Sequence, residues 1–77
     1  MRIISQDGKK DFPYEMCTIW VIGGKIIASP IGEPETEGVM AEYSVHEQVQ
    51  KAIKMLHKQY QEGLPNTIFC FPKEDKI

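Results

Sequence analysis

The sequence predicts a small α+β domain in which one amphipathic helix packs on one face of a mainly antiparallel sheet of about four to six short strands. Three observations predict this class. Helical periodicity occurs in one segment, residues 45 to about 61, short runs rich in β-branched and aromatic residues fill most of the remainder, and turn signals separate these runs. The expected order is β(β)βββαβ, in a single domain that spans the 77 residues.

The N-terminal part of the chain predicts a short hairpin. Residues 2–5 are the first strand candidate, and the Asp7-Gly8 pair predicts a turn that returns the chain through residues 10–14. Proline lacks a backbone N–H, so Pro13 places the returning segment at a sheet edge or ends it.

The strongest strand candidate is residues 16–22, MCTIWVI, because it is rich in β-branched and aromatic side chains. Gly23 and Gly24 follow as a two-residue hairpin turn, since both can adopt a positive φ, and residues 25–29 form the partner strand. The next stretch, residues 31–38, contains glycine, proline and three glutamates and predicts a loop.

Two further strands flank the helix, at residues 39–43 before it and 67–71 after it. The hairpins make the first part of the sheet antiparallel. The last strand either returns parallel through a right-handed crossover or lies at a sheet edge, and both arrangements stay open. The charged residues 73–77 are expected to fray.

The helix has clear end signals. Ser44 and Glu47 have the spacing of a capping box, Gly63 suits a left-handed C′ position, and Pro65 prevents continuation. Apolar side chains fall within an arc of roughly 120°. This predicted buried stripe contains Val45, Val49, Ala52, Ile53, Leu56 and Tyr60.

The predicted sheet has more apolar surface than one helix can cover. The strand at residues 16–22 is apolar on both sides, whereas one helix covers only one face of a sheet. The N-terminal hairpin, a second copy or a foreign protein must cover the other face. Trp20 is either a core residue or an interface anchor, since tryptophan dominates binding energy at interfaces. The candidate interface residues are Met16, Trp20, Ile22, Ile27 and Ile68.

The composition excludes several classes. The formal net charge of -2 argues against nucleic acid as the main partner. No apolar run approaches the ~20 residues that span a bilayer, and the N-terminus lacks the apolar core of a signal peptide, so we expect a cytoplasmic protein without a membrane partner. Cys17 and Cys70 predict two free thiols, with a disulfide as the alternative.

No residue pattern predicts catalysis, a cofactor or a metal. His46 and His57 lie on one shoulder of the helix, but eleven residues of helix separate them by roughly 16 Å, too far to share a metal ion. Neither histidine has a cysteine or serine nearby in sequence that reads as an activated nucleophile.

Two clusters of charged residues are most simply explained as solvated surface. Each also has a second, less favoured interpretation as a binding contact. The loop carboxylates predict a possible acidic contact with a basic partner, by mimicry of nucleic acid, and they are Glu33, Glu35 and Glu37. The lysines of the outer helix face predict a weak phosphate contact, and they are Lys51, Lys54 and Lys58.

Short stretches of the chain carry a family resemblance. They are the start MRIISQDG, the tripeptide PYE, MAEYS ahead of the helix, AIKML within it, and FCFP near the end. Together they resemble a group of small uncharacterised proteins of Gram-positive bacteria and their phages or prophages. The resemblance implies a source in a mobile element or its host, and a β-rich fold with one principal helix. It implies no activity.

We therefore expect a small cytoplasmic, non-enzymatic protein-interaction module of phage or mobile-element type. It would bind a protein partner, or itself as a homodimer, through the second sheet face and an exposed strand edge. The alternatives are a weak nucleic-acid-binding module that uses the helix lysines and an inhibitor-like acidic mimic that binds a basic host protein. The sequence predicts neither the strand order nor the identity of the partner.

Overall fold

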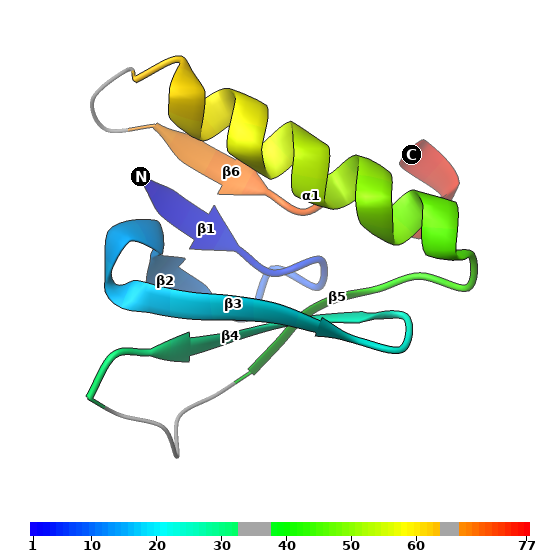
Figure 1. Cartoon of the computed structure of the whole chain (residues 1–77), viewed down its shortest axis with the longest axis horizontal. Coiled ribbons are helices and arrows are strands. Elements are labelled where there is room, and N and C mark those ends of the chain that lie inside the picture. Colours follow the sequence, from blue (N-terminus) through cyan, green and yellow to red (C-terminus); the bar gives the residue numbers. More distant parts are fainter. Residues whose placement is uncertain (33–37, 64–66) are drawn as a thin grey trace.

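The computed structural model describes residues 1–32, 38–63 and 67–77 and confirms the predicted α+β class (Figure 1). These residues form six strands, one α-helix and two short 3₁₀ helices. In chain order the elements are β1 (Arg2–Ile4), β2 (Asp11–Pro13), η1 (Tyr14–Met16), β3 (Cys17–Ile22), β4 (Lys25–Pro30), β5 (Gly38–Glu42), α1 (His46–Gln61), β6 (Ile68–Cys70) and η3 (Glu74–Lys76).

The strands form two three-stranded sheets, where the sequence predicts one. The first sheet has the order β2-β1-β6 and the second β3-β4-β5. β6 pairs parallel with β1, which resolves the position of the last strand, and every other pairing is antiparallel. The division arises because η1 redirects the chain between β2 and β3, so that the second hairpin starts a sheet of its own.

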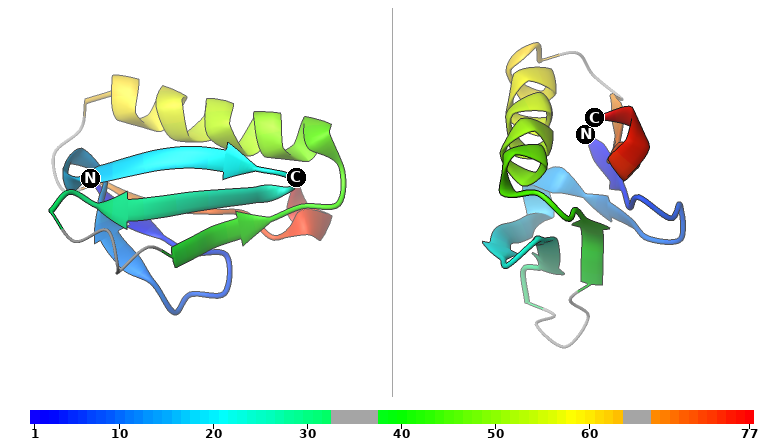
Figure 2. Two further views of the ribbon diagram at one scale, coloured as in Figure 1. Left: turned by 60° about the horizontal axis from the view of Figure 1, so that its bottom comes forward. Right: turned by 90° about the vertical axis from the view of Figure 1, so that its right-hand side faces the viewer.

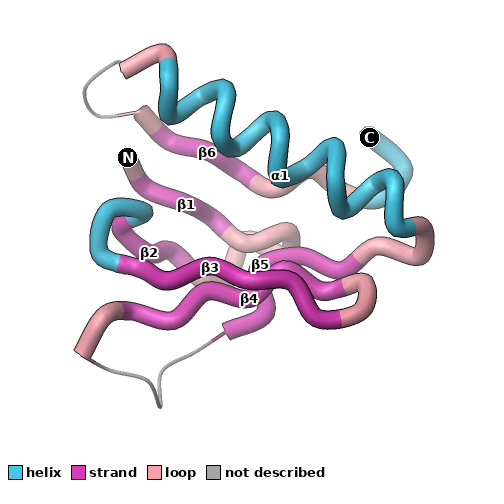
Figure 3. Tube along the Cα trace, in the orientation of Figure 1, coloured by secondary structure: helices cyan, strands magenta, loops and turns pink. Residues whose placement is uncertain are grey.

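The helix and the two sheets surround the core (Figure 2). α1 runs alongside β3 in the opposite direction, and this relation is equally clear in the trace of Figure 3. The buried apolar core draws on both sheets and the helix, and it contains Ile3, Ile26, Ala28, Met40, Ala41, Tyr43, Val49, Ala52, Leu56, Phe69 and Phe71.

Gln6 ties the two sheets together. Its backbone N–H donates to the Met40 carbonyl oxygen at 2.6 Å, and its side-chain Oε1 accepts from the Glu42 N–H at 3.1 Å. Its Nε2 donates to the Pro72 carbonyl oxygen, also at 3.1 Å. One residue of the β1–β2 turn thus holds β5 of the second sheet and the segment that follows β6 of the first.

Replacing Gln6 with alanine should lower the free energy of unfolding by about 1–2 kcal/mol, because two side-chain hydrogen bonds are lost and their partners are left without them. Urea denaturation followed by circular dichroism measures the change. Lys9→Ala is the matched control in the same turn, since Lys9 is exposed and only its backbone N–H bonds to Asp7. Equal losses of stability for the two substitutions would contradict the claim that the Gln6 side chain holds the two sheets together.

The buried stripe of the helix is narrower than predicted. Val49, Ala52 and Leu56 are buried and Ile53 is half-buried, in agreement with the periodicity. Val45 and Tyr60, predicted to belong to the stripe, are 51% and 46% exposed. Val45 caps the helix and so lies at its end, while Tyr60 packs against another aromatic ring at the margin of the core.

The helix begins one residue later than predicted. Val45 is the N-cap, not Ser44, and the Gln48 side-chain Oε1 accepts a hydrogen bond from the Val45 N–H at 3.2 Å. The Ser44 N–H donates instead to the Glu74 carboxylate at 2.7 Å, and the Gln48 Nε2 donates to the Glu74 carbonyl oxygen. The C-terminal segment thus lies against the start of α1. The expected fraying of residues 73–77 concerns motion and stays a prediction. The predicted role of Gly63 at the other end is consistent with its φ of 66°.

Three exposed carboxylates predict acid sensitivity. Hydrogen bonds from Ser5 to Asp7 and from Ser44 to Glu74 hold the pKa of each acid below its ordinary value, and the N-terminal ammonium, 2.7 Å away, does the same for the pKa of Glu15. A lowered folded-state pKa contributes stability above the ordinary pKa of 3.8 to 4.5, and this stability is lost as the pH falls through the folded-state value.

The urea midpoint should therefore hold steady down to about pH 5 and fall below it. Glu74→Gln should make the fall shallower, because the variant has no carboxylate at this position to protonate. A midpoint that stays constant to about pH 3 would contradict this account.

Candidate interaction surfaces

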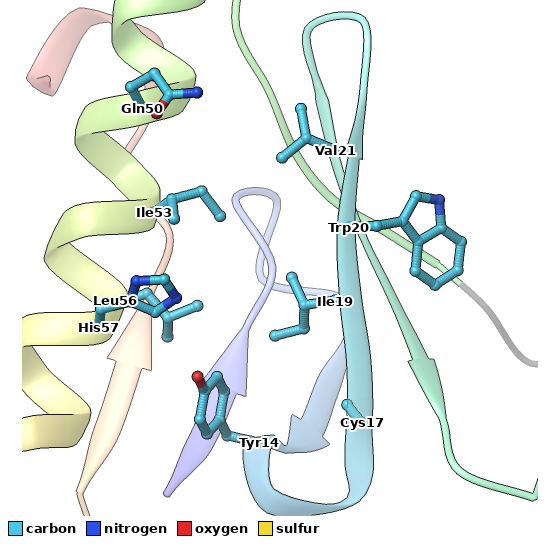
Figure 4. Close-up of a pocket in the computed structure, with 9 residues that line it drawn as sticks. All are labelled: Tyr14, Cys17, Ile19, Trp20, Val21, Gln50, Ile53, Leu56 and His57. Atoms are coloured by element: carbon cyan, nitrogen blue, oxygen red, sulfur yellow. The ribbon is translucent and has the colours of Figure 1, made fainter.

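One face of the second sheet is turned away from the helix. Cross-strand register places Trp20 opposite Ile27, Ile27 opposite Val39, and Ile22 opposite Lys25, and residues paired in this way share one side of a sheet. Figure 4 shows the Trp20 indole pointing away from α1. We call the surface formed by Trp20, Ile22, Ile27 and Val39 the Trp20 face.

The Trp20 face exposes apolar side chains. Ile22 is 59% and Val39 39% exposed, while the cross-strand partners Trp20 and Ile27 are half-buried. Met16 lies at the far end of the same hairpin, where its carbonyl oxygen accepts from the Ile31 N–H at 2.7 Å. Both of these residues are also exposed, so apolar surface continues to that end of the sheet.

The structure brings together most of the predicted interface residues. Trp20, Ile22 and Ile27 share the Trp20 face, and Met16 lies at its end. Ile68 is exposed on β6 and belongs to the other sheet, so the structure does not bring it together with these residues. Val39 was missed by sequence reasoning, because its side follows from the pairing of β5 with β4 and from an irregularity in register between Ile26 and Ile27.

A groove separates the edge of β3 from α1 (Figure 4). Its volume is about 410 Å³, and no lysine, arginine, aspartate or glutamate lines it. At one end of the groove the Tyr14 ring packs against the Tyr60 ring, with the centroids 4.7 Å apart and the ring planes tilted by 48°. The lining residues of this β3–α1 groove are Tyr14, Cys17, Ile19, Trp20, Val21, Gln50, Ile53, Leu56 and His57.

The groove contains two residue types that serve in nucleophilic catalysis, Cys17 and His57. Burial raises the pKa of the Cys17 thiol, with a smaller opposing influence from Arg2, and so favours the neutral thiol over the nucleophilic thiolate. Cys17 and His57 lie on opposite sides of the groove, on β3 and on α1 (Figure 4). The predicted free thiols are confirmed, with Cys17 in β3 and Cys70 exposed in β6.

The other candidate residues stay apart from these surfaces. The lysines at 51, 54 and 58 are exposed on the outer side of α1, as the helical periodicity predicts. The carboxylates at 33, 35 and 37 lie outside the described residues. Within residues 1–32, 38–63 and 67–77, no group of three or more histidine, cysteine, aspartate or glutamate side chains is placed to hold a metal ion.

Comparison with known proteins does not assign a function to these surfaces. The chain matches no protein-family model, no curated protein and no solved structure. In the part of the chain that the structure describes, no helix is long and apolar enough to cross a membrane. The class of the protein therefore has to be inferred from the Trp20 face and the groove.

Proposed function

We propose that the chain is a small non-enzymatic protein-interaction module that binds through the Trp20 face. The observation that carries the proposal is the set of apolar side chains on the sheet face that the helix leaves uncovered, with a tryptophan among them. Tryptophan combines a large contact area with few rotatable bonds, which is why it dominates interface energetics. The resemblance to proteins of bacteria and their phages supports a cytoplasmic module encoded by a mobile element.

A second copy of the chain is the occupant to test first. A two-fold axis lets one apolar patch cover the same patch on a partner, so that no second protein is needed. A domain of this size has a core that supplies only about 3–5 kcal/mol, so covering the Trp20 face would also stabilise each copy.

Sedimentation velocity from about 10 µM to about 1 mM protein tests this occupant. We expect association with rising concentration and a blue shift of tryptophan fluorescence, which reports on this face because Trp20 is the single tryptophan. Ile27→Lys should weaken association at least about tenfold, because it places a charge at the centre of the face. Met55→Lys is the matched control, an exposed apolar residue of α1 that lines neither surface.

A chain that stays monomeric throughout this range contradicts self-association. A photo-crosslinking side chain at position 27 then tests for a different protein partner, with position 51 on the outer helix face as the reference. Identical crosslinking patterns from the two positions would contradict the interaction module altogether.

A further inference from the structure

The free edge of β3 presents backbone groups that no other strand uses. Within the described residues β3 pairs only with β4, so it is an edge strand. The two-residue turn makes Ile22 and Lys25 a hydrogen-bonded pair, and such pairs alternate with non-bonded pairs along an antiparallel ladder. The N–H and C=O groups of Ile19 and Val21 therefore point away from β4.

Two other observations agree with this alternation of hydrogen-bonded and non-bonded pairs along β3 and β4. The Ile31 N–H donates to the Met16 carbonyl oxygen, which continues the series of bonded positions. Pro30, which has no N–H to donate, lies opposite Cys17, and Cys17 belongs to the non-bonded series. The outward direction of the backbone at Ile19 and Val21 is thus supported at both ends of the strand.

These outward groups line the β3–α1 groove. Trp20 borders the groove although its indole points away from it (Figure 4), so the wall at this point is backbone. The Ile19 and Val21 side chains point toward the groove, and Ile53 of α1 faces them from the other side. Among the described residues, no turn, loop or cap hydrogen bond reaches the backbone of Ile19 or Val21 on this side.

β3 lacks the features that protect an edge strand from pairing. Its sequence, CTIWVI, contains no charge, proline or glycine, and the register irregularity of this sheet lies between β4 and β5. An unprotected strand edge with an apolar groove beside it is the arrangement in which proteins bind an extended peptide as an added strand.

We propose that the β3–α1 groove binds a short extended peptide segment of another protein, which adds to β3 as a further strand. A second copy does not fit here. The groove accompanies residues 17–21, room for about four extended residues, and such a contact buries far less than the roughly 1,200 Å² of a stable dimer interface.

The lining of the groove defines the chemistry of the peptide. Because no lysine, arginine, aspartate or glutamate lines the walls, the peptide side chains that point into the groove, at every second position, should be uncharged and mainly apolar. The side chain that lies beside Trp20 on the outer side of the sheet should be β-branched or aromatic. Proline is excluded at the residues whose N–H groups meet the β3 carbonyl oxygens.

A phage-displayed library of short random peptides is the probe, panned against the full chain with Val21→Pro as the counter-target. Val21→Pro removes an outward N–H and leaves the β3–β4 ladder intact, because that N–H does not point to β4. Val21→Ala is its control, since it shortens the side chain but keeps the N–H. We expect enriched peptides with alternating apolar residues.

The affinity of a synthetic enriched peptide should fall at least about tenfold for Val21→Pro and less than about threefold for Val21→Ala. Gln50→Trp should also weaken binding at least about tenfold by filling the groove, while Lys51→Trp, on the outer helix face, should not. The helix variants keep the test decisive if Val21→Pro fails to fold. In hydrogen exchange, the peptide should slow the Ile19 and Val21 amides at least about tenfold.

Three results would overturn the proposal: no enrichment over the counter-target, binding that is insensitive to Gln50→Trp, or peptide contacts confined to the Trp20 face. The test is separate from that of the proposed function. Ile27→Lys should reduce peptide affinity far less than Gln50→Trp does, and Gln50→Trp should leave sedimentation unchanged, so each surface can fail without the other.

Discussion

Replacing Gly24 with alanine is expected to lower the free energy of unfolding by about 3 kcal/mol. A Cβ at Gly24 would run into the carbonyl oxygen of Tyr43. Neither backbone segment can move away easily, because the Tyr43 N–H donates to the Gly24 carbonyl oxygen at 2.8 Å and Tyr43 is itself buried. Thermal and urea denaturation of the variant measure the loss.

The adjacent Gly23 is the matched control, because its requirement for glycine has a different cause. Its φ is 60°, and a Cβ there would meet no heavy atom within 4 Å. Gly23→Ala should cost about 1–2 kcal/mol from the left-handed backbone alone, and Gly23→Asn less, since asparagine tolerates that conformation. Equal losses for Gly23→Ala and Gly24→Ala would show that the close approach of the Tyr43 backbone to this turn is not what limits position 24.

Leu56→Ala should also cost about 3 kcal/mol, because it removes a fully buried side chain at the centre of the helix stripe and leaves a cavity. A core that supplies about 3–5 kcal/mol would keep only about 0–2 kcal/mol after such a loss, so a measurable fraction of the molecules, up to about half, should be unfolded at room temperature. Circular dichroism against temperature and urea concentration measures both effects.

Met55, the preceding residue, is the control for this prediction. Its side chain is exposed on the shoulder of α1, so Met55→Ala should change the unfolding free energy by less than about 0.5 kcal/mol. A Leu56→Ala variant as stable as Met55→Ala would mean that the helix does not supply the core as described.

Local signals in the sequence predicted most of the elements. The Asp7-Gly8 and Gly23-Gly24 turns, the strand at residues 16–22 and the end of the helix at Gly63 all appear in the structure close to where turn chemistry and periodicity place them. These features depend on residues within a few positions of one another, so a single sequence contains the information that specifies them.

Features that depend on distant partners were not predictable in this way. The split into two sheets, and hence the position of Ile68, depends on which strands meet after the chain turns at η1. The helix start moved from Ser44 because Glu74, thirty residues later, accepts the Ser44 N–H. The Trp20 face was predictable from the two-sided apolar pattern of one strand, whereas the groove needs the position of α1 relative to β3.

The parallel pairing of β1 with β6 has a consequence for the order of folding. The first strand of the chain lies at the centre of its sheet, and one of its two neighbours is the last strand. The second hairpin, by contrast, joins strands that are adjacent in sequence. During synthesis the β1–β2 and β3–β4 hairpins can therefore form early, whereas the pairing of β1 with β6 waits until residues 68–70 have left the ribosome. Closing so long a loop is entropically costly, and this step should set the folding rate.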